Sequence, residues 1–203
     1  MIAVNKLSRS LIFKGFRKML TAQFGEAEAS QIWQEANSHL LELERKHPGI
    51  SGDNRMMILP SAALYLVLQN HAPEQALPLL RDYGTKIGSK IAGIVHAITS
   101  IPGVSRLMWK NAPKLMRNSS NPDKGYTRRI VSETRELVGV DILSCPLNDA
   151  AVKIGVPEAA LVICAMDKAY MTGFKHIRYN RTTSVAEGAE YCDYRLRYDE
   201  TKN

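Results

Sequence analysis

The feature of this sequence that most constrains its fold is the order of its secondary-structure patterns. Helical patterns fill the first half of the chain, and strand-like segments follow in two pairs. In the first half, apolar residues recur at helical spacing from Leu7 to Leu20, and residues 27–46 are rich in Ala, Glu, Gln and Leu. The second half follows the order strand, strand, helix, helix, strand, strand. Paired strands favour an antiparallel sheet, so the sequence predicts an α+β fold with a helical N-terminal half and a ββ-αα-ββ C-terminal half.

Five or six helices are expected before the turn cluster at residues 119–123. The expected helical segments are 7–20, 27–46, 60–70 and a helix that opens at Pro73 and continues in broken form to residue 98. After the turn cluster we expect strands at 126–133 and 135–143, helices at 148–154 and 157–171, and strands at 175–185 and 191–198, the last two joined by a turn at 187–188. The predicted regions are a helical region over 1–120 that packs on the sheet and an α+β region over 121–203, forming one compact unit.

The positive charge is concentrated in two segments. The chain has 27 Lys and Arg against 20 Asp and Glu, a net charge of +7. Residues 1–25 carry five basic residues and no acid, and residues 84–124 carry seven basic residues against Asp123 alone. This distribution favours an acidic partner, either a substrate, a phosphate or a membrane surface.

Several classes of protein are excluded by composition. No apolar run reaches the roughly 18 residues of a membrane span, and no secretory signal pattern begins the chain, so we expect a cytoplasmic protein that is not integral to a membrane. Three cysteines are too few for a disulfide framework. The usual nucleotide-binding, hydrolase-elbow and metalloprotease motifs are absent, as are a C-x-x-C pair and any nucleic-acid-binding motif. Nucleic acid is therefore not expected as a partner.

The last 60 residues hold all three cysteines, and acids lie close to two of them. Cys145 falls at an expected strand–helix junction, where a helix N-terminus favours a thiolate. Cys164 and Asp167 are three residues apart, on one face of a helix. Cys192 and Asp193 are neighbours on a strand, so only one of them can face a given pocket. The alternative is that each cysteine is a small buried apolar residue.

Two arginines in the same region could bind a carboxylate. Arg178 and Arg181 differ by three positions, so on a regular strand they point to opposite faces. One could hold a carboxylate through two hydrogen bonds while the other lies in solvent. The alternative is that both are surface residues of a basic protein.

The C-terminal part of the sequence, which carries these cysteines, acids and arginines, resembles one bacterial enzyme family, that of L-2-amino-thiazoline-4-carboxylic acid hydrolase. The resemblance rests on Cys145-Pro146, on Gly155-Val156-Pro157-Glu158, on Cys164 with Asp167, and on the run from Arg181 to Tyr194. Ser184 stands where threonine is frequent in the family, and Tyr194 where phenylalanine is usual. The resemblance covers residues 125–199. The C-terminal half is also similar to the 4-vinyl reductase and TRAPP-type small-molecule-binding fold.

The resemblance implies hydrolysis of a C–N bond in a small cyclic amidine, a thiazoline carboxylate. Water or a cysteine thiolate would attack the carbon between ring nitrogen and sulfur, an acid would protonate the leaving nitrogen, and an arginine would hold the carboxylate. The implied catalytic candidates are Cys145, Cys164, Asp167, Cys192, Asp193 and Glu187. The implied substrate-binding residues are Arg178, Arg181, Gly188 and Tyr194. A divalent metal held by cysteine and aspartate is left as an option, and so is a homo-oligomer.

Two other functions remain open. The chain could act on a different small molecule in secondary metabolism, with Met108, Trp109 and Met116 lining an apolar site. It could also be a non-catalytic small-ligand or membrane-surface module, since the basic N-terminal segment has apolar residues such as Leu7 and Leu11 at helical spacing. In the simpler interpretation this segment packs on the protein with its basic face in water.

Overall fold

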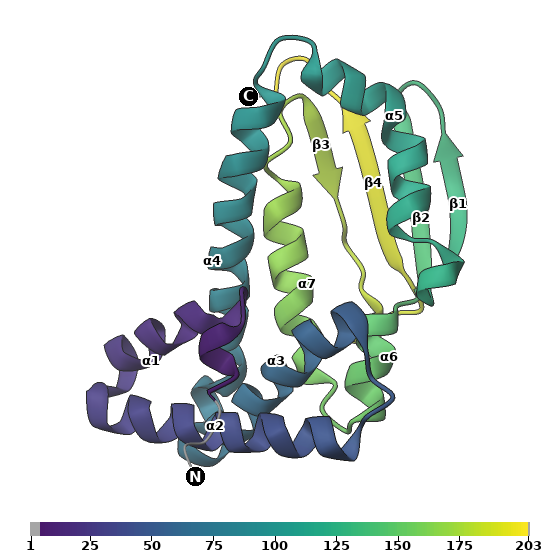
Figure 1. The fold of residues 1–203 in the computed structure, drawn as a ribbon. Helices are drawn as coiled ribbons and strands as arrows, with labels where there is room; N and C mark the ends of the chain where they lie inside the picture. Colours follow the sequence, from purple (N-terminus) through teal and green to yellow (C-terminus); the bar gives the residue numbers. More distant parts are fainter. Residues whose placement is uncertain (1–4, 203) are drawn as a thin grey trace. The chain divides into compact units, whose positions relative to one another are not determined.

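The computed structural model describes residues 5–202 and has the predicted α+β architecture (Figure 1). Helices come first, and two pairs of strands follow with two helices between them, so the predicted order is confirmed. The α-helices are α1 (Phe16–Phe24), α2 (Glu26–Lys46), α3 (Gly52–His71), α4 (Pro73–Thr99), α5 (Val104–Ser119), α6 (Pro146–Lys153) and α7 (Glu158–Met171). The strands are β1 (Thr127–Glu133), β2 (Leu137–Ser144), β3 (Ile177–Asn180) and β4 (Cys192–Tyr198).

The chain divides into two compact units. The first runs to Gly84 and includes Leu147–Ala165, and the second comprises Thr85–Pro146 and the chain from Met166 onward. The boundary falls inside α4 and α7, so each of these helices gives its N-terminal part to the first unit and its C-terminal part to the second. The expected packing of a region 1–120 on the sheet stays a prediction.

In the first unit, three apolar residues of the basic N-terminal segment belong to the core. Leu7, Phe13 and Phe16 have no exposed surface. Lys6 forms an ion pair with Glu44 of α2. These three side chains pack as the simpler interpretation expects, whereas Leu11 is 87% exposed, so the membrane-surface interpretation of this segment stays a prediction.

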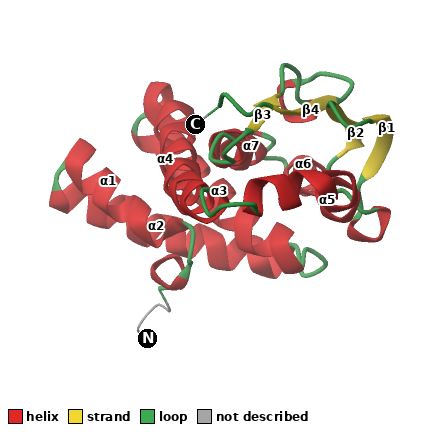
Figure 2. Cartoon of the chain, turned by 90° about the horizontal axis from the view of Figure 1, so that it is seen from above, coloured by secondary structure: helices red, strands yellow, loops and turns green. Residues whose placement is uncertain are grey.

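The second unit contains a four-stranded antiparallel sheet in the order β1-β2-β4-β3. Side chains alternate between its faces, and the pairing of Val140 with Tyr194 and of Ile142 with Cys192 places these four on one face. Figure 2 shows α5 and α7 on one side of the sheet. The apolar cluster that joins these layers comprises Ala112 of α5, Met171 of α7, and Val138, Ile177 and Leu196 of the strands.

The C-terminal parts of α4 and α7 approach each other through glycines. A Cβ atom added at Gly88 would lie 2.2 Å from the carbonyl oxygen of Met166. A Cβ atom added at Gly173, just after α7, would lie 2.3 Å from the carbonyl oxygen of Ala92. These distances are far below van der Waals contact, so glycine is required at both positions for this packing.

Several elements differ from their predicted extents. The segment expected as one helix over 7–20 forms two 3₁₀ turns, Leu7–Arg9 and Phe13–Gly15, before α1 begins, and the helix expected in broken form from Pro73 is continuous to Thr99. Strand β3 ends at Asn180 and not near residue 185, because the Asp193 side chain accepts hydrogen bonds from the backbone N–H groups of Thr182 and Thr183. Helix α3 begins at Gly52, eight residues before Pro60, which lies inside the helix. A proline removes one helical hydrogen bond but does not end a helix whose remaining residues pack well.

Among the residues with described positions, no single helix is long and apolar enough to cross a membrane, although α4 and α5 together, as a bent pair, meet the criteria of length and composition.

Candidate active site

Three residues of the quoted motifs come together in the second unit, from α7, β4 and the segment after β3. The Tyr194 hydroxyl donates a hydrogen bond to Asp167 Oδ2 at 2.7 Å. Arg181 Nη1 donates to the same oxygen at 3.3 Å and to the Tyr194 hydroxyl oxygen at 3.0 Å. The Arg181 guanidinium also lies 5.5 Å from the centroid of the Tyr194 ring. These three residues are called the Asp167 cluster below.

Burial sets the electrostatics of this cluster. The Arg181 side chain is only 6% exposed, whereas the Asp167 side chain keeps 29% of its surface exposed. Burial raises the pKa of the Asp167 carboxyl, and the Tyr194 hydroxyl and Arg181 charge partly offset this rise. Burial, followed by the Asp167 charge, also raises the pKa of Tyr194, so its hydroxyl stays protonated and donates a hydrogen bond to the carboxylate. Asp167 is therefore a carboxylate of increased basicity with a fixed orientation.

Asp167 and Tyr194 line a cavity of about 120 Å³ between α5, α7 and the inner face of the sheet. Its other walls are mostly apolar or aromatic and include Met116, Tyr126 and Tyr170. A second cavity of about 270 Å³ shares Met116 and Tyr170 and extends along α5. A few polar groups in an apolar cavity are typical of a small-molecule site.

The family model of L-2-amino-thiazoline-4-carboxylic acid hydrolase matches residues 53–196, which is more than half of the chain. This chain belongs to the L-2-amino-thiazoline-4-carboxylic acid hydrolase family. The match includes α3, α4 and α5, so the family relationship extends into the helical half, where no motif was evident from the sequence.

Other comparisons add little about function. A search of curated proteins finds no match. Solved structures with similarity include an H-NOX protein from S. oneidensis in the Fe(II)NO ligation state, with 12% identity, 94% of this chain and 98% of that chain covered, and a TM-score of 0.41. They also include the Fe(II) unliganded H-NOX protein from K. algicida, with 15% identity, 95% and 97% coverage, and a TM-score of 0.37.

Asp193, part of the family's terminal motif, lies on the other face of β4 from Tyr194. Its carboxylate accepts hydrogen bonds from the backbone N–H groups of Thr182 and Thr183, each at 2.7 Å, and from both threonine hydroxyls. These bonds outweigh the effect of burial and hold the pKa of Asp193 at about 2. Through these hydrogen bonds, Asp193 orders the segment that carries Arg181. Because its carboxyl group is ionised near neutral pH, Asp193 is a poor proton donor there.

The three cysteines of this hydrolase family member take different positions, and none of them forms a disulfide. Cys192 is buried with Val140 and Ile142, and its sulfur accepts a hydrogen bond from the Val185 N–H at 3.3 Å. Cys145 packs against the same apolar cluster, together with Met116, Tyr126 and Tyr194 of the cavity wall. Cys164 is half-buried on α7, one turn before Asp167, and belongs to the first unit.

The remaining predicted site residues lie outside the Asp167 cluster. Arg178 lies on β3, is exposed and forms an ion pair with Asp199. Arg181 lies beyond the end of β3, so the spacing argument for a regular strand does not apply to this pair. Glu187 is exposed at the end of a short 3₁₀ turn, Val185–Glu187. Gly188 follows with φ of +88°, a conformation that favours glycine, and so continues this turn.

Sequence reasoning missed the aromatic part of the site. Tyr126 and Tyr170 line the cavity, and the Tyr179 ring lies 5.7 Å from the Tyr194 ring. The Tyr179 hydroxyl is buried and makes no hydrogen bond within residues 5–202. The three-residue spacing of Asp167 and Tyr170 on a helix was the one signal that could have linked Tyr170 with the site.

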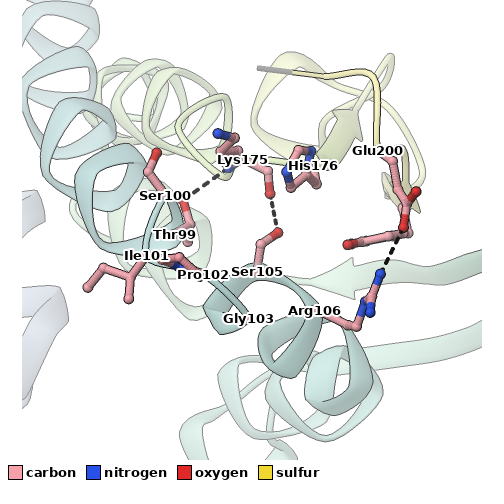
Figure 3. Close-up of a pocket in the computed structure, with 11 residues that line it drawn as sticks. Thr99, Ser100, Ile101, Pro102, Gly103, Ser105, Arg106, Lys175, His176 and Glu200 are labelled. Carbon is pink, nitrogen blue, oxygen red and sulfur yellow. Dashed lines mark hydrogen bonds and ion pairs between the residues drawn. The ribbon is translucent and has the colours of Figure 1, made fainter.

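A further cavity of about 510 Å³ lies at the turn between α4 and α5 (Figure 3). Across it, Ser105 donates a hydrogen bond to the carbonyl oxygen of Lys175, and the Lys175 N–H donates to Thr99 Oγ1 at 3.0 Å. Arg106 and Glu200, which also line the cavity, form an ion pair. None of the quoted family motif residues lines this cavity. In the described part of the chain, no group of three or more His, Cys, Asp or Glu residues is arranged to hold a metal ion.

Proposed function

We propose that this protein hydrolyses a C–N bond of a small cyclic amidine carboxylate, of the kind represented by L-2-amino-thiazoline-4-carboxylate, in the cavity beside Asp167. The observation that carries the proposal is a carboxyl group of raised pKa that lines an apolar cavity and is oriented by Tyr194 and Arg181. A perturbed acid in a cavity is a candidate for proton transfer. Membership of the hydrolase family supports the reaction class.

In this proposal, Asp167 first acts as a base and then as an acid. Water attacks the amidine carbon between ring nitrogen and sulfur, and one proton of this water passes to the Asp167 carboxylate. The bond from this carbon to the ring nitrogen then breaks. The nitrogen gains two protons, one from Asp167 and one from the added hydroxyl, and becomes an amine. The carbon becomes the carbonyl of a carbamoyl group that stays on sulfur, so one water is consumed.

Tyr194 and Arg181 act through Asp167. The Tyr194 hydroxyl holds one carboxylate oxygen, which fixes the direction in which the other can meet water. Arg181 compensates the negative charge of Asp167 in a buried setting. Its positive charge also favours a substrate that carries a carboxylate. The ordering of the Arg181 segment by Asp193 would keep this geometry.

The experiment is a comparison of kcat/KM for L-2-amino-thiazoline-4-carboxylate between the wild type and Asp167→Asn. Loss of the proton-transfer group should lower kcat/KM by about 10² to 10⁴-fold. Glu136→Gln, a change in the exposed turn between β1 and β2, is the matched control and should leave the rate unchanged. Equal turnover by wild type and Asp167→Asn would exclude this role of Asp167.

A further inference from the structure

The C-terminal half of α4 carries a row of isoleucines on its outer side. Ile91, Ile94, Ile98 and Ile101, the last just past the helix end, are 38%, 62%, 52% and 56% exposed. Their spacing of three, four and three residues places them along one side of the helix. Most large apolar side chains of this protein are buried, so a continuous exposed row of them indicates a surface that a binding partner covers. This row is called the isoleucine stripe.

The opposite side of the same helix segment is fixed within the second unit. Ala92 packs against Gly173, and Gly88 against Met166, at distances that leave no room for a Cβ atom on either glycine. Thr99 is buried and accepts a hydrogen bond from the Lys175 N–H. The isoleucine stripe is therefore the outward side of a helix whose inner side is already packed.

Charge is arranged around the stripe and not within it. Residues 91–105 contain no Asp, Glu, Lys or Arg, whereas an outward helix side in water normally carries charged residues. Lys86 and Lys90 precede the stripe on the same helix, both exposed, and Arg106 follows it. Between residues 84 and 122 there is no acidic residue. An apolar stripe with basic neighbours is typical of helices that lie on anionic membranes.

We propose that the isoleucine stripe, with Lys86 and Lys90, binds the surface of an anionic lipid membrane. The isoleucine side chains enter the boundary between headgroups and acyl chains, and the lysine ammonium groups contact lipid phosphates. Ile101 is among the residues that line the cavity at the α4–α5 turn, and Figure 3 shows its side chain extending away from the other lining residues.

A second copy of the chain fits the stripe less well. In a parallel pair of stripes Lys90 of one copy would lie near Lys90 of the other, and in an antiparallel pair it would lie near Arg106. The parallel arrangement brings like charges together, and in the antiparallel one the acidic partner of Arg106, Glu200, is already used within its own copy, so neither arrangement supplies Lys90 with an acidic partner. An anionic bilayer offers acyl chains to the isoleucines and negatively charged headgroups to the neighbouring lysines.

The test is flotation of the purified full chain with vesicles of phosphatidylcholine alone and of phosphatidylcholine with phosphatidylglycerol. The wild type should float with the anionic vesicles and not with the neutral ones, and added salt should weaken the binding. Ile94→Ser with Ile98→Ser, and separately Lys86→Glu with Lys90→Glu, should each lower the bound fraction about tenfold. Val152→Ser, which alters an equally exposed apolar residue on α6, is the control and should bind as the wild type does.

Absence of wild-type binding to anionic vesicles would overturn the proposal, and so would undiminished binding by the isoleucine variant. A wild-type dimer in light scattering that the isoleucine variant loses, without vesicle binding, would assign the stripe to a second copy instead. Thermal melting of each variant checks that it is folded. The stripe shares no residue with the Asp167 cavity, so turnover of the soluble substrate should be unchanged in these variants. Failure of this proposal is thus distinguishable from failure of the proposed hydrolase function.

Discussion

Asp167 combines two opposing influences at the scale of a single residue. Burial raises its pKa, while the Tyr194 hydroxyl and the Arg181 guanidinium stabilise its ionised form. The result is a carboxylate that remains ionised near neutral pH in our proposal but binds a proton more readily than an exposed aspartate does. Asp193 shows the opposite balance, since its hydrogen bonds lower its pKa to about 2.

The pH dependence of the reaction follows from the direction of the Asp167 shift. The proposed base must be ionised, so kcat/KM should fall as the pH decreases through a pKa above the ordinary 3.8 of an aspartate. Tyr194→Phe removes a hydrogen bond that favours the ionised form, so this fall should begin about one pH unit higher. The measurement is kcat/KM against pH for both proteins. Identical profiles would contradict the role of Tyr194.

Serine substitutions of the cysteines distinguish the two nucleophiles that the sequence leaves open. If water attacks the amidine carbon, Cys145→Ser, Cys164→Ser and Cys192→Ser should each keep kcat within about tenfold of the wild type. Cys192→Ser should also lower the melting temperature, because this thiol is buried in an apolar cluster. Steady-state kinetics and thermal melting check both points. A loss of more than about 10³-fold in kcat for a folded Cys145→Ser would instead favour a thiolate nucleophile.

At the scale of elements, the site depends on where β3 stops and on how closely α4 meets α7. Strand β3 ends early because Asp193, on the neighbouring strand, holds the backbone of Thr182 and Thr183 out of the sheet. Because the chain leaves the sheet at this point, Arg181 lies near α7, where it donates a hydrogen bond to Asp167. The glycine contacts between α4 and the end of α7 are in the same unit and set the position of that helix end.

Gly173→Ala tests the close packing of α4 on the end of α7. The new Cβ atom would lie within 2.7 Å of three Ala92 backbone atoms, so the free energy of unfolding should fall by about 3 kcal/mol. Gly93→Ala is the matched control on α4, since a Cβ atom there meets nothing within 4 Å. This control should be neutral or slightly stabilising, because alanine favours a helix. Urea unfolding of the two variants compares them, and equal stabilities would contradict the packing argument.

At the scale of the whole molecule, the sequence predicts the order of elements but not the assembly of the site. Local patterns define each helix and strand, so the α+β class and the ββ-αα-ββ order could be predicted. The early end of β3 could not, because it depends on Asp193, which lies eleven and ten positions from Thr182 and Thr183, the residues it binds. The C-x-x-D spacing paired Asp167 with Cys164, whereas its contacts in the structure are Tyr194 and Arg181.

The family assignment describes the molecule as a whole, and the proposed reaction describes one cavity in its second unit. The fold of the second unit brings the terminal motif to the inner and outer faces of one sheet. On the inner face, Tyr194 lines the cavity and donates a hydrogen bond to Asp167. On the outer face, Asp193 orders the segment that carries Arg181. Both faces of β4 therefore contribute to a single site.

The most direct test of this account is mass spectrometry of L-2-amino-thiazoline-4-carboxylate incubated with the wild type and with Asp167→Asn. We predict that the wild type converts the substrate to a product heavier by one water, an S-carbamoyl amino acid, and that Asp167→Asn does so far more slowly. No hydrated product from a folded wild-type protein would contradict the proposed reaction.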